Sequence, residues 1–318
     1  MRFSYSNIQL FRQCPLKWFY KYREGLGEPE TPALVAGKMF HEVAELYYSG
    51  KTYAHIFEEY EKLVGSGFFE NDKSLLEDTF ALYLEHYRAS DAKEKIIGVE
   101  EEIEVPFEDD DTFIGIIDRI VEIGTMIVVR DTKTTFRPLK YRTEDVRYSP
   151  QFLTYDALVE YKHAIKVGAV EVDEVRIARL DKVPINKNGM PSADMRRLSL
   201  VTYEEYYKKL VDMGIEDVPP YDGVLEQLKK RGHPLFQRIR VPMLDKSLVD
   251  SALNDVRATY RLIKHALANE EEVPFPRHRS PLCNYCGLKG LCELDHFTPT
   301  DHEREIVMGK NNIKKVDK

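Results

Sequence analysis

Two aspartates and a lysine between residues 113 and 135 are spaced so that one hairpin would bring them together. A Gly-Thr pair at 124–125 separates two apolar runs, which predicts antiparallel strands joined by a two-residue turn. The register about this turn places Asp118 opposite Asp131, and Lys133 shares the face of Asp131. Opposed carboxylates about 5 Å apart repel each other, so the pattern predicts a cation between them. The alternative is an exposed hairpin with scattered charges.

Four cysteines lie at opposite ends of the chain: Cys14, and then Cys283, Cys286 and Cys292. The last three have the spacing C-x2-C-x5-C. The N-terminus has no signal-peptide core, so we expect reduced thiols and no disulfides. Four thiolates suit a structural zinc ion or an iron–sulfur cluster, and the spacing alone leaves both open.

Two helices are predicted before the hairpin, and each carries a candidate functional residue. Ser4 or Ser6 can cap the first helix, which Pro15 kinks directly after the N-terminal cysteine. The second helix contains His41 and ends at Gly50. A histidine within a helix can be a ligand, although this is the less common case. The alternative is an ordinary surface or core histidine.

A strand with alternating polarity begins at Ile96 and precedes the hairpin. Glu101 shares its face with apolar residues, and it is the glutamate that we expect to approach the metal site. The other face carries three glutamates that we expect to be solvated: Glu100, Glu102 and Glu104.

The elements after the hairpin complete a fold class. Ser149 and Pro150 predict the start of a helix, which places Gln151 and Tyr155 four residues apart on one face. Residues 170–182 predict a further strand. Together the elements predict an α/β fold, a central mixed β-sheet flanked by helices.

The chain divides into four predicted regions. They are a core with the N-terminal cysteine helix (1–182), a mostly helical elaboration (183–270), a cysteine segment (271–297) and a charged, disordered tail (298–318).

The charge pattern bears on the partner. The chain has 318 residues and a formal net charge of −8, which disfavours a broad basic face but is compatible with a local basic groove. Predicted DNA contacts follow the hairpin: Arg137, Lys140, Arg142 and Arg147. A second basic group suits a solvated face as well as it suits DNA: Lys229, Lys230, Arg231, His233, Arg238 and Arg240. The sequence contains no P-loop motif and no apolar run of about 20 residues, so we expect a cytoplasmic protein with no membrane span and no ATPase.

In their order along the chain, these pieces resemble the PD-(D/E)xK nuclease superfamily. Asp118, the Asp131-x-Lys133 pair and the Gln-x-x-x-Tyr pair at 151–155 match its acidic, D/E-x-K and Q-x-x-x-Y motifs. The SYS and CP elements at 4–15, the GKMFHE element at 37–42 and the cysteine triplet are similar to RecB-type nuclease domains with an iron–sulfur cluster, as in AddB and the CRISPR-adaptation nucleases. Arg130 departs from the family pattern, which has an apolar residue there, and we expect it to disturb helix packing on the opposite face.

The resemblance implies a restriction-endonuclease-like core with Mg²⁺ or Mn²⁺. It implies metal ligands at His41, Asp118, Asp131 and the backbone carbonyl of Thr132, and catalytic roles for Asp118, Asp131, Lys133, Gln151 and Tyr155. It also implies a [4Fe-4S] cluster, with zinc as the alternative, on Cys14, Cys283, Cys286 and Cys292.

The implied activity is exonuclease hydrolysis of phosphodiester bonds in single-stranded or resected DNA, in recombination, repair or phage DNA metabolism. Because the chain encodes no ATPase, any unwinding would come from a separate helicase or recombination protein. Two alternatives stay open. One is a non-catalytic scaffold that binds DNA ends, and the other is a restriction-type endonuclease in which 183–270 reads the sequence.

Overall fold

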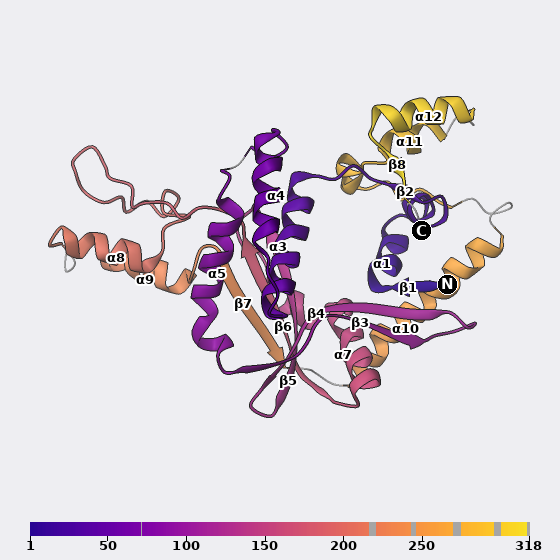
Figure 1. Cartoon of the computed structure of the whole chain (residues 1–318), viewed down its shortest axis with the longest axis horizontal. Coiled ribbons are helices and arrows are strands. Elements are labelled where there is room, and N and C mark those ends of the chain that lie inside the picture. The colour runs from indigo at the N-terminus through magenta and orange to yellow at the C-terminus, as the bar shows by residue number, and fades with distance from the viewer. Residues whose placement is uncertain (71, 216–220, 243–245, 270–274, 296–299, 317–318) are drawn as a thin grey trace.

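The computed structural model describes residues 1–318 except 71, 216–220, 243–245, 270–274, 296–299 and 317–318. Its centre is a six-stranded mixed sheet with the order β1-β4-β5-β6-β7, in which β3 also pairs with β4 (Figure 1). The strands of this sheet are β1 (Arg2–Ser4), β3 (Glu94–Pro106), β4 (Thr112–Ile123), β5 (Met126–Thr135), β6 (Val167–Arg176) and β7 (Phe236–Pro242). The predicted α/β class with a central mixed sheet is confirmed.

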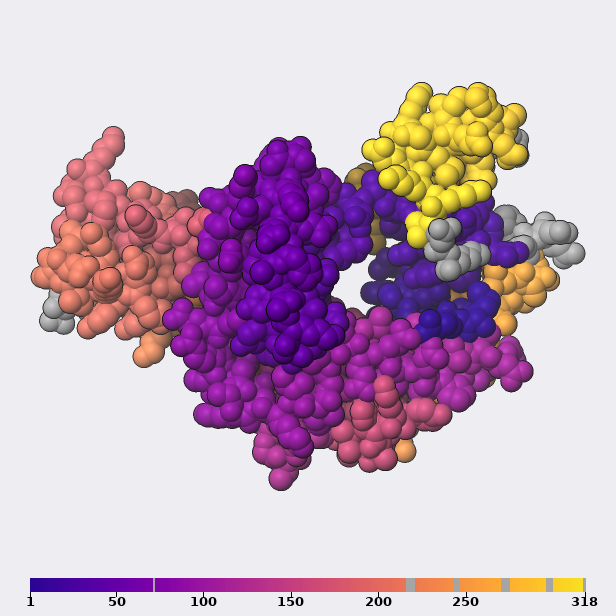
Figure 2. Space-filling view, in the orientation of Figure 1, coloured from indigo at the N-terminus to yellow at the C-terminus, as the bar shows by residue number. Residues whose placement is uncertain are grey.

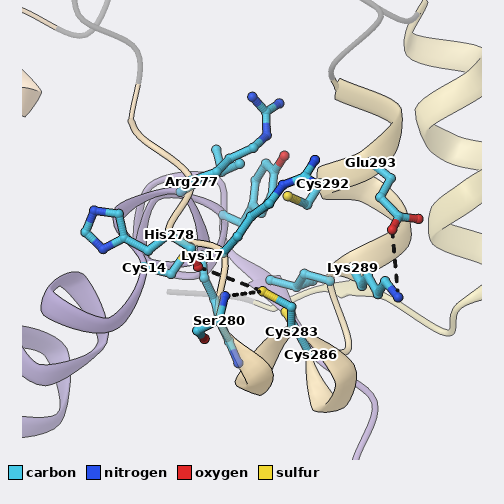
Figure 3. A pocket seen from close by; sticks show the side chains of 14 residues that line it. Cys14, Lys17, Arg277, His278, Ser280, Cys283, Cys286, Lys289, Cys292 and Glu293 are labelled. Atoms are coloured by element: carbon cyan, nitrogen blue, oxygen red, sulfur yellow. Dashed lines mark hydrogen bonds and ion pairs between the residues drawn. The ribbon is translucent and has the colours of Figure 1, made fainter.

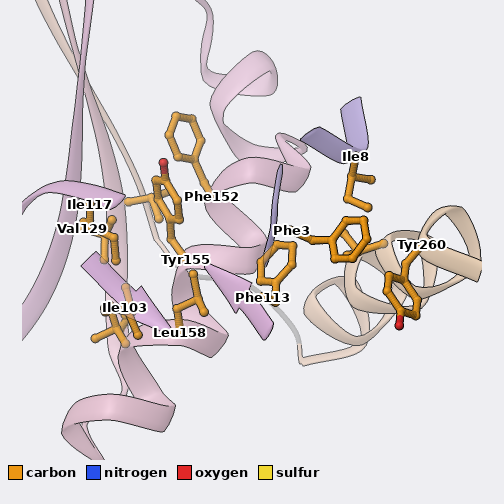
Figure 4. Close-up of a cluster of buried hydrophobic side chains, with 14 of the residues drawn as sticks. Phe3, Ile8, Ile103, Phe113, Ile117, Val129, Phe152, Tyr155, Leu158 and Tyr260 are labelled. Carbon is orange, nitrogen blue, oxygen red and sulfur yellow. The ribbon is translucent and has the colours of Figure 1, made fainter. Parts of the chain in front are cut away.

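Helices cover both faces of the sheet. One face packs against α1 (Tyr5–Gln13), α7 (Pro150–His163) and α10 (Lys246–Ala268). In this main core Ile117 and Val129 of the sheet lie among Phe152 and Leu158 of α7 (Figure 4). The other face packs against α3 (Pro32–Tyr48), α4 (Ala54–Gly65) and α5 (Leu75–Asp91). Strands β4 and β5 are therefore held between two helical layers, which restricts where their side chains can point.

The hairpin has the predicted register. β4 and β5 pair antiparallel from the turn as far as Arg119 and Arg130, and Asp118 and Asp131 come next, where the two strands part. Nearer its start, at Thr112–Ile114, β4 pairs in parallel with β1 instead. One edge of β4 therefore pairs first with β1 and then with β5. Asp118 and Asp131 lie between these two paired stretches.

Both ends of the chain meet in a small terminal subdomain. The N-terminal side provides α2 (Pro15–Trp18), the π-helix η1 (Phe19–Arg23) and β2 (Leu26–Gly27), and the C-terminal side provides η2 (Pro281–Tyr285), α11 (Lys289–Leu294), α12 (Asp301–Lys310) and β8 (Lys314–Lys315). β2 pairs with β8, and Tyr20, Leu291 and Ile313 form a shared core.

The charged tail forms structure where composition indicated disorder. Thr300 caps α12 by accepting from the backbone of Glu303, and Val307 and Met308 pack against the terminal core. The two apolar side chains give the helix a surface to bury, which charge composition alone does not reveal. Parts of the predicted tail, 298–299 and 317–318, lie outside the described residues.

A second lobe has a hydrophobic core of its own within residues 183–231. α8 (Tyr203–Asp212) and α9 (Tyr221–Arg231) pack there around Tyr206, Leu210 and Leu228, and the lobe projects to one side of the molecule (Figure 1). The elaboration was expected to run to residue 270, but β7 completes the main sheet and α10 lies in the main core. In the described part of the chain no helix is long and apolar enough to cross a membrane.

Candidate active site

The centre of the candidate site is the parting of β4 and β5. The backbone N–H of Thr132 donates to Oδ2 of Asp118 at 2.7 Å, which ties that carboxylate to β5. Asp131 is buried, and the Lys133 ammonium nitrogen lies 2.7 Å from its Oδ2. The structure thus brings together the two aspartates and the lysine on one face. The Thr132 carbonyl as a metal ligand stays a prediction.

His41 reaches this cluster from α3. Its Nδ1 lies 3.4 Å from Oδ2 of Asp118. The helix approaches β5 closely because Gly37, one turn earlier, has no side chain: a Cβ there would lie 2.7 Å from Oγ1 of Thr134. Residues four apart share a helix face, so the contact at Gly37 also aims His41 toward the carboxylates.

A further acid joins the cluster, and it is Glu100 rather than Glu101. Oε1 of Glu100 lies 3.8 Å from Nδ1 of His41, and one ligand atom each from His41, Glu100 and Asp118 all lie within 4.8 Å of one another. Glu101 instead pairs with Lys162 of α7 at 2.7 Å. The prediction that Glu101 approaches the metal site is therefore wrong.

The register between β3 and β4 explains the difference. Val99 pairs with Arg119 and Glu101 pairs with Ile117, so Glu100 falls opposite Asp118 and on the same face. Glu100 also has a φ of +44°, a conformation that costs free energy in a non-glycine residue and that often occurs at functional sites. The acidic turn at 108–110 connects β3 to β4, and its position sets the register of the two strands. This turn is the feature of the sequence that could have identified Glu100.

Negative charge exceeds positive charge in the cluster. Burial, reinforced by the charge of Asp131, raises the pKa of Asp118 to about 7. Burial also raises the pKa of Asp131, although Lys133 opposes the shift. Burial disfavours a charged imidazole at His41, but the neighbouring carboxylates of Glu100 and Asp118 outweigh it and raise the pKa of His41. Raised carboxyl pKa values of this kind show that negative charges are buried and crowded together, and carboxylate oxygens with an imidazole suit a divalent cation such as Mg²⁺ or Mn²⁺.

Gln151 and Tyr155 lie on the face of α7 that meets Asp131. Nε2 of Gln151 donates to the Tyr155 hydroxyl at 2.7 Å and to Oδ1 of Asp131 at 3.3 Å. The helix lies this close to β4 because Gly115 has no side chain, since a Cβ there would overlap Leu158 and crowd Tyr155. The structure therefore brings this pair to the buried carboxylate.

The predicted DNA-contact residues lie on the loop after β5 and on α6 (Thr143–Arg147). Arg137, Lys140 and Arg142 are exposed, and Arg147 is partly buried. The loop is held by Glu174, a buried residue of β6 whose carboxylate accepts the backbone N–H of Lys140 at 3.0 Å. These four residues follow the site in the chain without contacting its carboxylates in any hydrogen bond or ion pair of the described residues.

The second basic group is largely committed to contacts within the protein. Nε of Arg238 lies 2.6 Å from Oδ1 of Asp173, a fully buried carboxylate. Arg240 pairs with Glu171, and Arg231 donates to a backbone carbonyl of the second lobe at 2.7 Å. The charges of Arg238 and Arg240 are therefore compensated by internal carboxylates, whereas Lys229 and Lys230 are exposed.

Arg130 is fully buried without the disturbance of helix packing that we expected. Its guanidinium forms two hydrogen bonds to Glu94, at 2.7 and 2.8 Å, and two to Glu171, at 2.7 and 2.5 Å. Arg119, opposite it in the hairpin, bonds Asp173 at 3.0 Å. Paired carboxylates compensate the buried charges, and these acids come from strands that are distant in the sequence.

The four cysteines line one cavity of about 310 Å³ between the chain ends (Figure 3). Cys14 lies between α1 and α2, Cys283 in η2, Cys286 directly after it and Cys292 in α11. Tetrahedral zinc with bonds of about 2.3 Å would place its sulfurs about 3.8 Å apart. Among the described residues, however, no three cysteine sulfurs lie within 4.8 Å of one another. Cationic side chains line the same cavity: Lys17, Arg277, Arg279 and Lys289.

The space-filling view shows an opening through the molecule (Figure 2). Figure 2 shows it between the purple helices and the indigo N-terminal segment, above the magenta strands. Helix α3, which carries His41, borders the opening in this view.

Comparison with known proteins agrees with the geometry. A family model described as the PD-(D/E)XK nuclease superfamily matches residues 2–293. A search of curated proteins finds no match. The matched range contains the hairpin, α3, α7 and all four cysteines, and the mixed sheet with its acidic cluster is consistent with that family. The chain belongs to the PD-(D/E)XK nuclease superfamily, whose members are metal-dependent nucleases.

Proposed function

We propose that this protein is a Mg²⁺- or Mn²⁺-dependent exonuclease that hydrolyses phosphodiester bonds in DNA. The observation that carries the proposal is the acidic cluster at the end of the catalytic hairpin, with a lysine 2.7 Å from its buried aspartate. His41, Glu100, Asp118 and Asp131 would hold the ion, with the Thr132 carbonyl as a further oxygen ligand.

The side chains of the site divide the work of hydrolysis. A bound divalent ion supplies positive charge to a phosphate oxygen and makes a water molecule more acidic. Lys133 orients that water or neutralises the charge that develops on the phosphate. Burial opposes a charge on Lys133, but the neighbouring Asp131 outweighs it and raises the pKa of the ammonium, which therefore stays a cation at neutral pH. Gln151 and Tyr155 position the DNA backbone next to Asp131.

The substrate in this proposal is single-stranded or resected DNA with a free end. The opening beside α3 supports it, because a strand can enter an enclosed passage only by its end (Figure 2). Arg137, Lys140, Arg142 and Arg147 would bind phosphates outside the passage. The cellular role would be recombination, repair or phage DNA metabolism in the cytoplasm, with a separate helicase or recombination protein for any unwinding.

We further propose that the terminal subdomain holds a [4Fe-4S] cluster on Cys14, Cys283, Cys286 and Cys292. Two observations support a larger, negatively charged group. No three of the four sulfurs, all in the described part of the chain, lie within 4.8 Å of one another, and the lysines and arginines that line the cavity outnumber its glutamate, Glu293. Such a cluster would tie the N-terminal helix to the C-terminal cysteine segment and stabilise the fold. Anaerobic purification should yield a brown protein with about four iron atoms per chain, whereas a colourless protein with one zinc would contradict the cluster.

In this organisation the nuclease core comprises 1–182 with β7 and α10, the lobe at 183–231 flanks it, and 271–297 completes the cluster. Two competing functions make different predictions. A scaffold that binds DNA ends would cut nothing, and a restriction-type endonuclease that reads sequence through the lobe would cut closed circles at discrete positions.

The test is digestion of linear and covalently closed single-stranded DNA of equal length, with Mg²⁺ or Mn²⁺. We expect progressive shortening of the linear DNA, an intact circle and no reaction in EDTA. Discrete cuts in the circle would support the endonuclease, and two intact substrates would support the scaffold.

A further inference from the structure

A second cavity of about 610 Å³ adjoins the candidate active site on the far side of Lys133. It lies within the range of ~300–1,000 Å³ typical of pockets for small ligands. Lys133 and Gln151 lie at its boundary with the carboxylate cluster, and three tyrosines are among the other residues that line it: Tyr5, Tyr141 and Tyr148. Whatever fills this cavity therefore lies next to the phosphate that Lys133 faces.

The three tyrosine rings are available to a ligand. In the described part of the chain none of them stacks on another aromatic ring, and none of their hydroxyls forms a hydrogen bond. The ring of Tyr148 is 57% exposed. Most other aromatic side chains of this protein pack against one another in the cores. Tyr5 and Tyr141 are only partly buried beside the main core, with the Lys140 ammonium 6.0 Å from the centre of the Tyr141 ring, and Tyr148 is exposed.

The backbone holds these rings in place. Tyr148 ends α6 and directly precedes Ser149 and Pro150, where α7 begins. The backbone N–H of Tyr141 donates to the buried Glu174 at 3.1 Å, and Tyr5 opens α1. Rings that are positioned before a ligand arrives lose little conformational freedom on binding, which favours affinity.

The charges of the cavity distinguish a base from a phosphate. Glu144 and Asp145 line it, whereas among the described residues that line the cavity Lys133 is the only lysine or arginine, and it is paired with Asp131. Two carboxylates repel a phosphate, but they can accept hydrogen bonds from the amino groups of a nucleobase. Aromatic rings stack on any base, because every base has a π-face.

We propose that this cavity is a nucleobase subsite that stacks one unpaired base beside the scissile phosphate. The subsite rests on the proposed function, and it deepens it by giving a reason for preference of single strands. A base inside an intact duplex is stacked and paired, so it cannot enter the cavity unless the helix opens. Tyr148 is the ring that contributes most to this stacking, because it is the most exposed of the three.

The test is equilibrium binding of fluorescent single-stranded 12-mers in EDTA, where no cleavage occurs. One abasic residue is moved through the oligonucleotide, and each oligonucleotide is titrated with wild-type protein and with Tyr148→Ala. We expect one sensitive position at which loss of the base weakens wild-type binding about 5- to 100-fold. Tyr148→Ala should weaken binding of the intact strand by a similar factor, with no further loss when the sensitive base is absent.

Two controls separate stacking from folding. Tyr148→Phe should retain wild-type affinity because it keeps the ring. Tyr161→Ala removes a comparably exposed tyrosine (62%) on α7 outside the cavity, and it should leave binding and the sensitive position unchanged.

Equal affinity at every abasic position, or additive losses from the abasic residue and Tyr148→Ala, would overturn the subsite. Because binding is measured without metal, a protein that stacks the base yet fails to cleave DNA would refute the proposed function and leave the subsite standing. In cleavage assays with Mn²⁺, the sensitive position should lie next to the bond that is cut.

Discussion

Replacement of Asp118 by asparagine should stabilise the metal-free protein and abolish its response to metal. The carboxylate of Asp118 is buried beside Asp131, which raises its pKa from 3.8 to about 7. Each pH unit of such a shift corresponds to about 1.4 kcal/mol, so the ionised group costs the fold about 4 kcal/mol at pH 8. Asparagine removes the charge and can still accept the hydrogen bond from the Thr132 N–H.

The stability gained by Asp118→Asn should depend on pH. A carboxyl whose folded-state pKa is raised destabilises the fold fully above about pH 7, and the penalty disappears as the pH falls toward 3.8, the unfolded value. The gain from Asp118→Asn should therefore be about 4 kcal/mol at pH 8 and near zero at pH 4. Urea unfolding in EDTA at several pH values measures it.

Metal supplies the second half of the experiment. Saturating Mn²⁺ should raise the unfolding midpoint of the wild type and leave that of Asp118→Asn unchanged, because a ligand stabilises only the state that binds it. A variant less stable than wild type in EDTA at pH 8, or equally stabilised by Mn²⁺, would refute the reasoning.

Three further predictions concern the residues around the site. Gly37→Ala should weaken Mn²⁺ binding by displacing His41, and adding Thr134→Ala should restore it by removing the clash; calorimetric titration that shows no rescue would contradict the account of α3. Glu100→Gln should weaken Mn²⁺ binding several-fold, and Glu101→Gln should leave it unchanged. Weaker binding by Glu101→Gln alone would show that Glu101, and not Glu100, is the ligand. Arg130→Met should lower the free energy of unfolding by about 3–5 kcal/mol, because it strands two buried carboxylates. The exposed control Arg137→Met should change it by less than about 0.5 kcal/mol in urea, and equal effects would show that the buried pairs are unimportant.

Local patterns were sufficient for the elements that local interactions define. A two-residue turn sets the register of β4 and β5, so the approach of Asp118 to Asp131 could be predicted from the sequence. Helical spacing likewise placed Gln151 and Tyr155 on one face. The meeting of Cys14 with the distant cysteine triplet followed from the chemistry of four thiolates rather than from any local pattern.

The misses arose where pairing between strands, some of them distant in the sequence, decides which way a side chain faces. Glu100 faces the site because of the register between β3 and β4. The prediction chose Glu101 because its apolar neighbours were assumed to lie on the same side of the strand as the metal. A buried arginine at position 130 does not fit a pattern of apolar residues on the buried face of a strand. It is stable there because the sheet brings Glu94 and Glu171 beside it. β7 was missed because its pairing with β6 spans a whole lobe of the chain.

The most direct test of the central claim is the rate at which Lys133→Ala degrades linear single-stranded DNA in Mn²⁺. Loss of a positioned cation at the transition state should slow cleavage about 100- to 1,000-fold, with Mn²⁺ affinity kept because the carboxylates remain. Lys51→Ala, which removes an exposed lysine of the loop after α3, is the matched control and should retain the wild-type rate. If Lys133→Ala cuts DNA as fast as the wild type, the hairpin is not the catalytic centre.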